Sequence, residues 1–143
     1  MKINREFTKN SQSPYENIKF KKASTEILNP DGSLVFKLED FDVPEGWSQV
    51  ASDILSQKYF RKAGVPNKIK RTEEKNVPSW FSPRVADEES EELSFSSEKN
   101  SQQVFDRLAG AWTYWGWKGN YFSSEEDARA VFDEVRYMLA MQM

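Results

Sequence analysis

The chain has 143 residues, of which 30% are charged and 38% apolar, and it contains neither cysteine nor histidine. These absences exclude disulfide bonds, cysteine nucleophiles, Ser-His-Asp triads, dithiol redox chemistry and zinc sites built from thiolate or imidazole ligands. The net charge of −3 is uneven, because residues 1–75 carry 14 basic and 11 acidic side chains, whereas residues 76–143 carry 6 basic and 12 acidic ones.

Residues 1–13 are polar and without periodicity, which predicts a flexible arm. A β-hairpin is predicted over residues 17–43, because two runs of strand type flank the turn sequence Asn29-Pro30-Asp31-Gly32. A lone hairpin is marginally stable in water. We therefore expect this hairpin to lie against a helix or against another part of a larger protein.

A helix is predicted over residues 47–63, with Gly64 and Pro66 ending it. Its expected buried stripe follows helical spacing and consists of Trp47, Val50, Ala51, Ile54 and Leu55. Residues 67–99 carry no periodic pattern and are expected to form a long irregular linker, with residues 86–99 exposed. Trp80-Phe81 lies within it, and we expect this pair to pin the linker to the rest of the protein.

Two further helices are predicted over residues 101–118 and 124–143. A capping box of Ser123 and Glu126 begins the second, which has no stop signal at its end. Because few residues join them, we expect the two helices to be antiparallel neighbours. Gly110 and Gly116 interrupt the first of them, which indicates close approach of a neighbouring group.

The fold class that follows is α+β and mainly α, with an N-terminal β-hairpin, about three helices and a long irregular linker. No apolar run of about 18 residues occurs, which predicts no membrane span. The N-terminus lacks the apolar segment of a secretory signal, so we expect a cytoplasmic protein.

Two sequence features could carry binding. The segment 112–122 holds six aromatic residues among eleven, and the stretch 58–75 holds seven basic residues against Glu73 and Glu74. Aromatic and basic side chains together can stack on bases and hold phosphates. Helical spacing instead favours Trp112 and Trp115 as core residues. Three further aromatic residues are expected at the helix end, where they could cover the hairpin: Trp117, Tyr121 and Phe122.

Carboxylates are numerous, but no pair has the spacing of a catalytic or metal site. Asp106 and Arg107 fall in mid-helix, and Asp133, Glu134 and Arg136 are typical of a polar helix face. Paired acids can hydrolyse glycosides, yet nothing in the sequence selects one pair. We therefore assign no catalytic, cofactor-binding or metal-binding residue.

Two long segments resemble a known family. Residues 47–66, with the sequence WSQVASDILSQKYFRKAGVP, and residues 104–117, with the sequence VFDRLAGAWTYWGW, are similar to the N-terminal region of adenosylcobalamin-dependent (class II) ribonucleotide reductases. Gly119, Tyr121-Phe122 and the closing residues 137–140 fit the same family, as does the hairpin turn 29–33. The resemblance covers most of residues 14–143, and the stretch 67–99 matches weakly.

The resemblance implies an N-terminal region that packs against a ten-stranded α/β barrel in a larger enzyme converting ribonucleotides to deoxyribonucleotides. In that family adenosylcobalamin generates a thiyl radical on a barrel cysteine, a cysteine pair reduces the sugar, and thioredoxin-like partners recycle that pair. A chain without cysteine is then a supporting part, so it would bind no cofactor itself. Its implied partner is the remaining reductase polypeptide, whether the chain is a fragment or the product of a split gene.

Two alternatives remain open on the sequence alone. A stand-alone module could bind single-stranded nucleic acid through the basic stretch 58–75 and the aromatic segment 112–122, although the net negative charge argues against it. A structural adaptor without a small ligand would have only a protein partner. The family resemblance favours a supporting piece of a reductase, with no membrane and no direct nucleic-acid contact.

Overall fold

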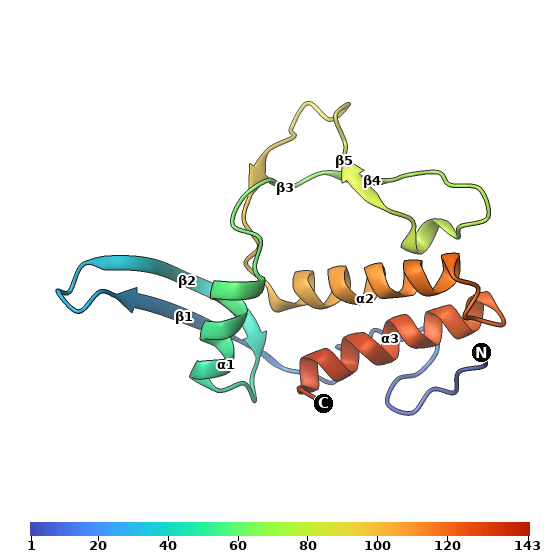
Figure 1. Ribbon diagram of the computed structural model, residues 1–143, viewed down its shortest axis with the longest axis horizontal. Helices are drawn as coiled ribbons and strands as arrows, with labels where there is room; N and C mark the ends of the chain where they lie inside the picture. The colour runs from blue at the N-terminus through green and yellow to red at the C-terminus, as the bar shows by residue number, and fades with distance from the viewer.

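The computed structural model describes all 143 residues. A two-stranded hairpin and a short helix form one end of an elongated molecule, and an antiparallel pair of long helices forms the other (Figure 1). A long segment arches over the first of these helices, and the N-terminal residues run beside the second. This arrangement is the predicted α+β class, a hairpin followed by three helices.

The predicted hairpin over residues 17–43 is confirmed, with strands that begin at residue 20 and end at residue 44. Strand β1 spans Phe20–Leu28 and strand β2 spans Leu34–Pro44, paired antiparallel. Gly32 adopts a positive φ of 85° in the turn, a conformation that suits glycine. The Asp31 carboxylate accepts the backbone N–H of Ser33 at 2.8 Å, which closes the turn locally.

Helix α1 spans Gln49–Ile54 and continues as a single π-helical turn over Leu55–Tyr59. Ser48 caps it by accepting the N–H of Ala51 at 3.2 Å. The predicted continuation to residue 63 is wrong, because the backbone becomes extended at Phe60. That turn lets the Phe60 ring pack edge-on against Phe41 with centroids 5.5 Å apart.

The predicted buried stripe of α1 is also wrong in part. Val50 and Ile54 are 66% and 50% exposed, whereas Ser52, Leu55 and Ser56 are buried. Both serine hydroxyls donate to carbonyls of their own helix, so their burial leaves no unpaired donor. Their small size lets α1 lie close to β1, and the side chains of Val50 and Ile54 face outward.

The segment expected to be an irregular linker has short pairings that join its two limbs. Its elements are β3 (Val65–Pro66) paired with β6 (Phe95–Ser96), β4 (Ile69–Arg71) paired with β5 (Arg84–Ala86), and a 3₁₀ turn at Ser79–Phe81. Residues 86–99 are therefore not a free linker. These two- and three-residue pairings carry no sequence signal, because they depend on partners up to 31 positions away.

Helix α2 spans Ser101–Lys118 and helix α3 spans Glu125–Met141, antiparallel and in contact as predicted. The predicted capping box of α3 is wrong by one residue: Ser124 is the cap, and it accepts the N–H of Asp127 at 3.2 Å. The last helical residue is Met141, and Gln142 after it has a left-handed backbone. No helix is long and apolar enough to cross a membrane.

The core lies where the hairpin, α1 and the adjacent ends of α2 and α3 meet. Its members are Tyr15, Phe41, Val43, Trp47, Leu55, Phe60, Val104, Phe105 and Ala140. The indole N–H of Trp47 donates to the carbonyl of Ala140 at 2.7 Å and so ties the hairpin end of the molecule to α3.

The molecule exposes more surface than a free-standing protein of its mass. Its accessible surface is 9296 Å², against about 7,600 Å² expected for a compact monomer of this size. Only 24 of 143 residues are buried. The chain therefore exposes about a fifth more area than a compact monomer of the same mass.

Candidate functional site

The aromatic segment on α2 does not form the core that its spacing predicts. Trp112 and Trp115 are 44% and 63% exposed, so their assignment to the core is wrong. Helix α2 instead buries Ala109 and Thr113, and Gly110 lies against Phe132 of α3. Small residues on this face let the two helices approach closely, which turns the tryptophans to the surface.

Trp117, Tyr121 and Phe122 do not cover the hairpin, because they lie at the other end of α2 (Figure 1). The Phe122 ring occupies the space beside Gly116, where an added Cβ would come within 2.7 Å of the ring. The close approach expected at Gly116 is therefore confirmed, and the approaching group comes from the α2–α3 connection itself.

Trp80 and Phe81 pin the arching segment to the helix pair, as predicted. The indole N–H of Trp80 donates to Glu125 at 2.8 Å, and its ring packs against Phe132 with centroids 5.5 Å apart. Phe81 is buried and packs against the ring of Trp117. One end of the segment is thereby fixed above α2 and α3.

A polar network links α2, α3 and the N-terminal residues. Arg136 contacts Asp106 at 3.2 Å and Asp133 at 2.6 Å, and Arg5 contacts Asp133 at 2.6 Å. The Tyr15 hydroxyl donates to Asp106 at 2.8 Å, and burial, followed by the Asp106 charge, raises the pKa of Tyr15. The predicted polar face of α3 thus serves to attach other segments.

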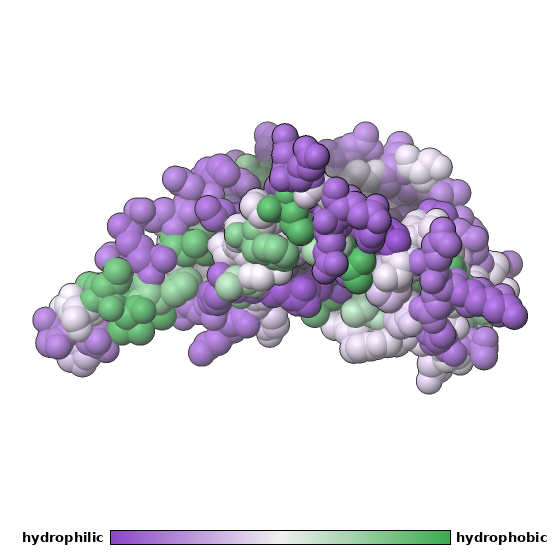
Figure 2. All heavy atoms as spheres, turned by 90° about the horizontal axis from the view of Figure 1, so that it is seen from above, coloured by the Kyte–Doolittle hydropathy of each residue, from purple (hydrophilic) through white to green (hydrophobic).

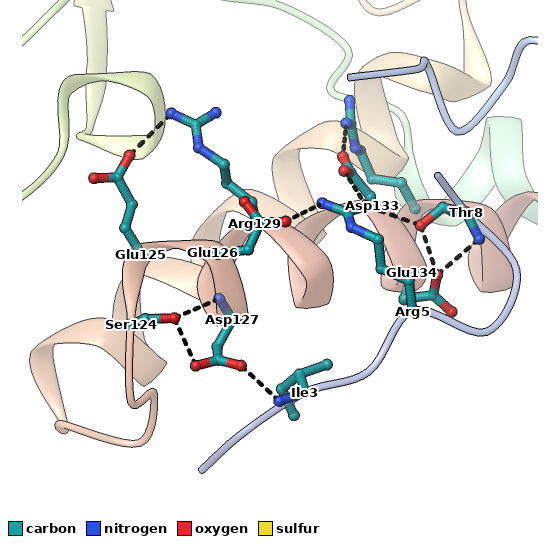
Figure 3. A network of polar contacts seen from close by, with 11 residues as sticks. Ile3, Arg5, Thr8, Ser124, Glu125, Glu126, Asp127, Arg129, Asp133 and Glu134 are labelled. Atoms are coloured by element: carbon teal, nitrogen blue, oxygen red, sulfur yellow. Dashed lines mark hydrogen bonds and ion pairs between the residues drawn. The ribbon is translucent and has the colours of Figure 1, made fainter. Parts of the chain in front are cut away.

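The N-terminal residues are tied down, which corrects the expected flexible arm of residues 1–13. Asp127 accepts the N–H of Ile3 at 2.7 Å, and Glu134 accepts the N–H of Thr8 at 2.8 Å (Figure 3). Glu134 also accepts the N–H of Phe7 at 3.1 Å. The amide of Ile3, followed by the hydroxyl of Ser124, lowers the pKa of Asp127. Burial alone would raise the pKa of Glu134, but the hydrogen bonds from Thr8 and Phe7 outweigh it and lower that pKa.

Acid should therefore release the N-terminal residues. Because folded Asp127 and Glu134 have pKa values below their usual 3.8 and 4.5, their contribution is complete above those values and is lost as the pH falls below them. Amide hydrogen exchange at Ile3, Phe7 and Thr8, corrected for intrinsic rates, should accelerate below about pH 4 before α2 loses protection. Loss of protection in both regions together would contradict a separate release of the arm.

A buried ion pair closes the base of the arching segment. Glu98 is 4% exposed and contacts the guanidinium of Arg107 at 3.0 Å through both carboxylate oxygens. It also accepts the backbone N–H of Arg61 at 2.8 Å. Arg61 lies where the chain leaves α1 and Glu98 lies just before α2, so this carboxylate holds the two limbs together.

An open cleft of about 480 Å³ lies between the arching segment and the helix pair, and we call it the arginine cleft. Five arginines line it: Arg61, Arg71, Arg84, Arg107 and Arg136. Asp106 is the single acidic residue of the lining, and aromatic side chains complete it, among them Trp80, Tyr114 and Trp115. The residues that line the cleft include five positive side chains and one negative side chain, although the whole chain carries a net charge of −3.

The structure brings together part of each binding feature expected from the sequence. Arg61 and Arg71 of the basic stretch lie in the same cleft as Tyr114 and Trp115 of the aromatic segment. Arg84 is the residue that sequence reasoning missed, because it reaches the cleft only through the pairing of β4 with β5. No group of three or more acidic side chains is placed to hold a metal ion.

A second feature is apolar. At the outer end of the hairpin, Leu28, Leu34 and Val35 are 52%, 56% and 56% exposed, and we call these three the hairpin tip. Hydrophobic atoms gather over the outer part of the hairpin in Figure 2. Apolar side chains collected at a projecting tip are typical of a surface that another protein segment covers.

The fold is thus a helical body with a β-hairpin whose outer end carries exposed apolar side chains. The model of the family described as class II vitamin B12-dependent ribonucleotide reductase matches residues 21–142. The vitamin B12-dependent ribonucleotide reductase of Bradyrhizobium diazoefficiens is 57% identical over 148 aligned residues, covering 100% of this chain and 12% of the relative. Its counterpart from Agrobacterium fabrum is 58% identical over 147 residues, covering 99% and 12%.

The vitamin B12-dependent ribonucleotide reductase of Streptomyces coelicolor is 25% identical over 145 residues, covering 100% of this chain and 12% of the relative. The chain belongs to the family of class II vitamin B12-dependent ribonucleotide reductases and corresponds to their N-terminal region. The resemblance inferred from the sequence is thereby confirmed. The chain spans about an eighth of the length of these relatives.

Proposed function

We propose that this chain is a non-catalytic part of a vitamin B12-dependent ribonucleotide reductase and packs against the catalytic remainder through the hairpin tip. This proposal rests on the exposure of Leu28, Leu34 and Val35 on a strand pair that projects from the molecule. Leu28 and Leu34 are directly paired across the hairpin, so their side chains form one apolar surface.

The excess accessible surface supports the same proposal. A chain that exposes about a fifth more area than a compact monomer of its mass gains stability by burying that area against a partner. The relatives supply such a partner, since 88% of their length lies outside the matched region. We place the catalytic barrel, the thiyl radical and the reducing cysteine pair of the family in that remainder, where thioredoxin-like reductants and the nucleotide substrate would also act.

We also propose that cobalamin binds to the catalytic remainder of the reductase and not to this chain. The cavities of the chain have volumes of about 380–510 Å³ and are open to solvent, too small to enclose a corrin ring with its nucleotide loop. The chain has no histidine and so offers no imidazole nitrogen that could bind a cobalt ion. The residues present do not fit this cofactor, and we assign none of them to it.

The proposal predicts that one charge at the hairpin tip blocks association. The probe is the Agrobacterium fabrum reductase lacking the segment that matches this chain, titrated with the 143-residue chain. Leu34→Asp should raise the dissociation constant about tenfold or more, because a carboxylate would be buried without a partner. Leu34→Met is the matched variant that keeps the apolar surface, and it should bind as the wild type does.

Circular dichroism should show both variants folded, since Leu34 is 56% exposed. Equal affinity of Leu34→Asp and the wild type would remove the hairpin tip from the interface. Failure of the wild-type chain to bind the truncated reductase would overturn the proposed packing.

A further inference from the structure

The arginine cleft contains three guanidinium groups without an acidic partner. The chain has seven arginines, and four of them pair with a carboxylate: Arg5, Arg107, Arg129 and Arg136. The other three, Arg61, Arg71 and Arg84, make no ion pair, and all three line the cleft. Unpaired arginines are thus confined to one place.

Two of these arginines are set directly opposite each other. Arg71 on β4 pairs with Arg84 on β5, and like charges in opposed positions destabilise an antiparallel pair. The guanidinium of Arg71 donates to the carbonyl of Ser82 at 2.6 Å. Burial, followed by the charge of Arg84, lowers the pKa of Arg71. An anion bound between the two side chains would relieve this repulsion.

The rest of the lining offers an aromatic face. Trp115 is 63% exposed although it borders the cleft, so its ring is free to stack on a planar ligand. Trp80 is already covered by the guanidinium of Arg129, 4.4 Å above its ring. A cleft of about 480 Å³ has the size of small-molecule sites rather than of a nucleic-acid track.

We propose that the arginine cleft binds a nucleoside polyphosphate, with the phosphates on Arg61, Arg71 and Arg84 and the base on Trp115. Guanidinium groups bind phosphate oxygens in bidentate pairs, and aromatic rings stack on bases of any sequence. Basic residues of the stretch 58–75 other than Arg61 and Arg71 do not line the cleft, which disfavours a long nucleic-acid strand. This site is a property of the 143-residue chain and is independent of its packing against the catalytic remainder.

The test is titration of the 143-residue chain with ATP, tripolyphosphate, adenosine and a single-stranded oligonucleotide, followed by tryptophan fluorescence and calorimetry. ATP should bind more tightly than tripolyphosphate, and adenosine should bind weakly. The double variant Arg71→Gln with Arg84→Gln should weaken ATP binding about tenfold or more, because two charge-assisted contacts are lost. Trp115→Ala should abolish the preference for ATP over tripolyphosphate.

Lys22→Gln is the control, because Lys22 is an exposed cation on β1 that pairs with Asp42 and does not line the cleft. It should leave ATP affinity within about twofold of the wild type. Removing the like-charge pair should also leave the melting temperature of the unliganded double variant unchanged or higher. This second readout separates a ligand site from a structural role, for which the melting temperature would fall.

Three results would overturn the proposal. The first is absence of ATP binding at millimolar concentration, and the second is an equal loss of affinity in Lys22→Gln and the double variant. The third is tighter binding of the oligonucleotide than of ATP, which would identify a nucleic-acid surface instead. Should the double variant not fold, Arg61→Gln replaces it, since Arg61 is exposed and lies outside the strands.

Discussion

Replacing Phe41 by alanine should lower the free energy of unfolding by about 3–5 kcal/mol, the usual cost of truncating a buried phenylalanine. Phe41 is 0% exposed and packs edge-on against Phe60 in the core. The core is small, with nine members in a chain of 143 residues, so few other contacts can compensate for the cavity. Urea denaturation followed by circular dichroism measures the change.

Phe95→Ala is the matched control, because it makes the same chemical change at a phenylalanine that is 58% exposed. Its effect should stay within about 0.5 kcal/mol. Similar losses for the two variants would mean that Phe41 does not lie in the core described above.

Replacing Glu98 by glutamine should lower the free energy of unfolding by about 2–3 kcal/mol. The substitution keeps the shape of the side chain and removes the charge that Arg107 and the N–H of Arg61 contact. Arg107 is 22% exposed at its side chain, so water can solvate it in part, and the cost stays below that of a fully buried pair. Urea denaturation again gives the value.

The carboxylate of Glu98 also joins the two limbs of the arching segment, which gives a local readout. Amide exchange at Arg61 should accelerate in Glu98→Gln more than exchange within α3. Glu39→Gln is the control: its ion pair with Lys37 is largely exposed, and its loss should change stability by less than about 0.5 kcal/mol. Equal effects of the two substitutions would remove the special role of Glu98.

Local signals predicted the elements whose ends are set by neighbouring residues. The hairpin turn at Asn29–Gly32 and the span Ser101–Lys118 of α2 both follow from turn and capping residues that act within a few positions. The early end of α1 could not be predicted in this way. The chain leaves the helical conformation at Phe60, and the Phe60 ring packs against Phe41. This contact joins two parts of the chain that are distant in sequence.

Helical spacing shows which side chains share a face, but it does not show which face is covered. Val50 with Ile54 on α1, and Trp112 with Trp115 on α2, follow helical spacing and are nevertheless exposed, because smaller residues occupy the buried faces. Part of the lining of the arginine cleft could be predicted from the composition of the stretch 58–75 and the segment 112–122. Their meeting point depends on the β4–β5 pairing, which no local pattern encodes.

In the proposed function, this chain supplies a non-catalytic part that the reductase needs. The most direct measurement is cobalamin-dependent ribonucleotide reduction by the Agrobacterium fabrum reductase lacking its matching segment, with and without the 143-residue chain, which is 58% identical to that segment. We expect little ribonucleotide reduction by either polypeptide alone and recovery of this activity when the two are mixed. The recovery should be weaker when the 143-residue chain carries Leu34→Asp. Full activity of the truncated reductase alone, or binding of the chain without any gain in activity, would contradict it.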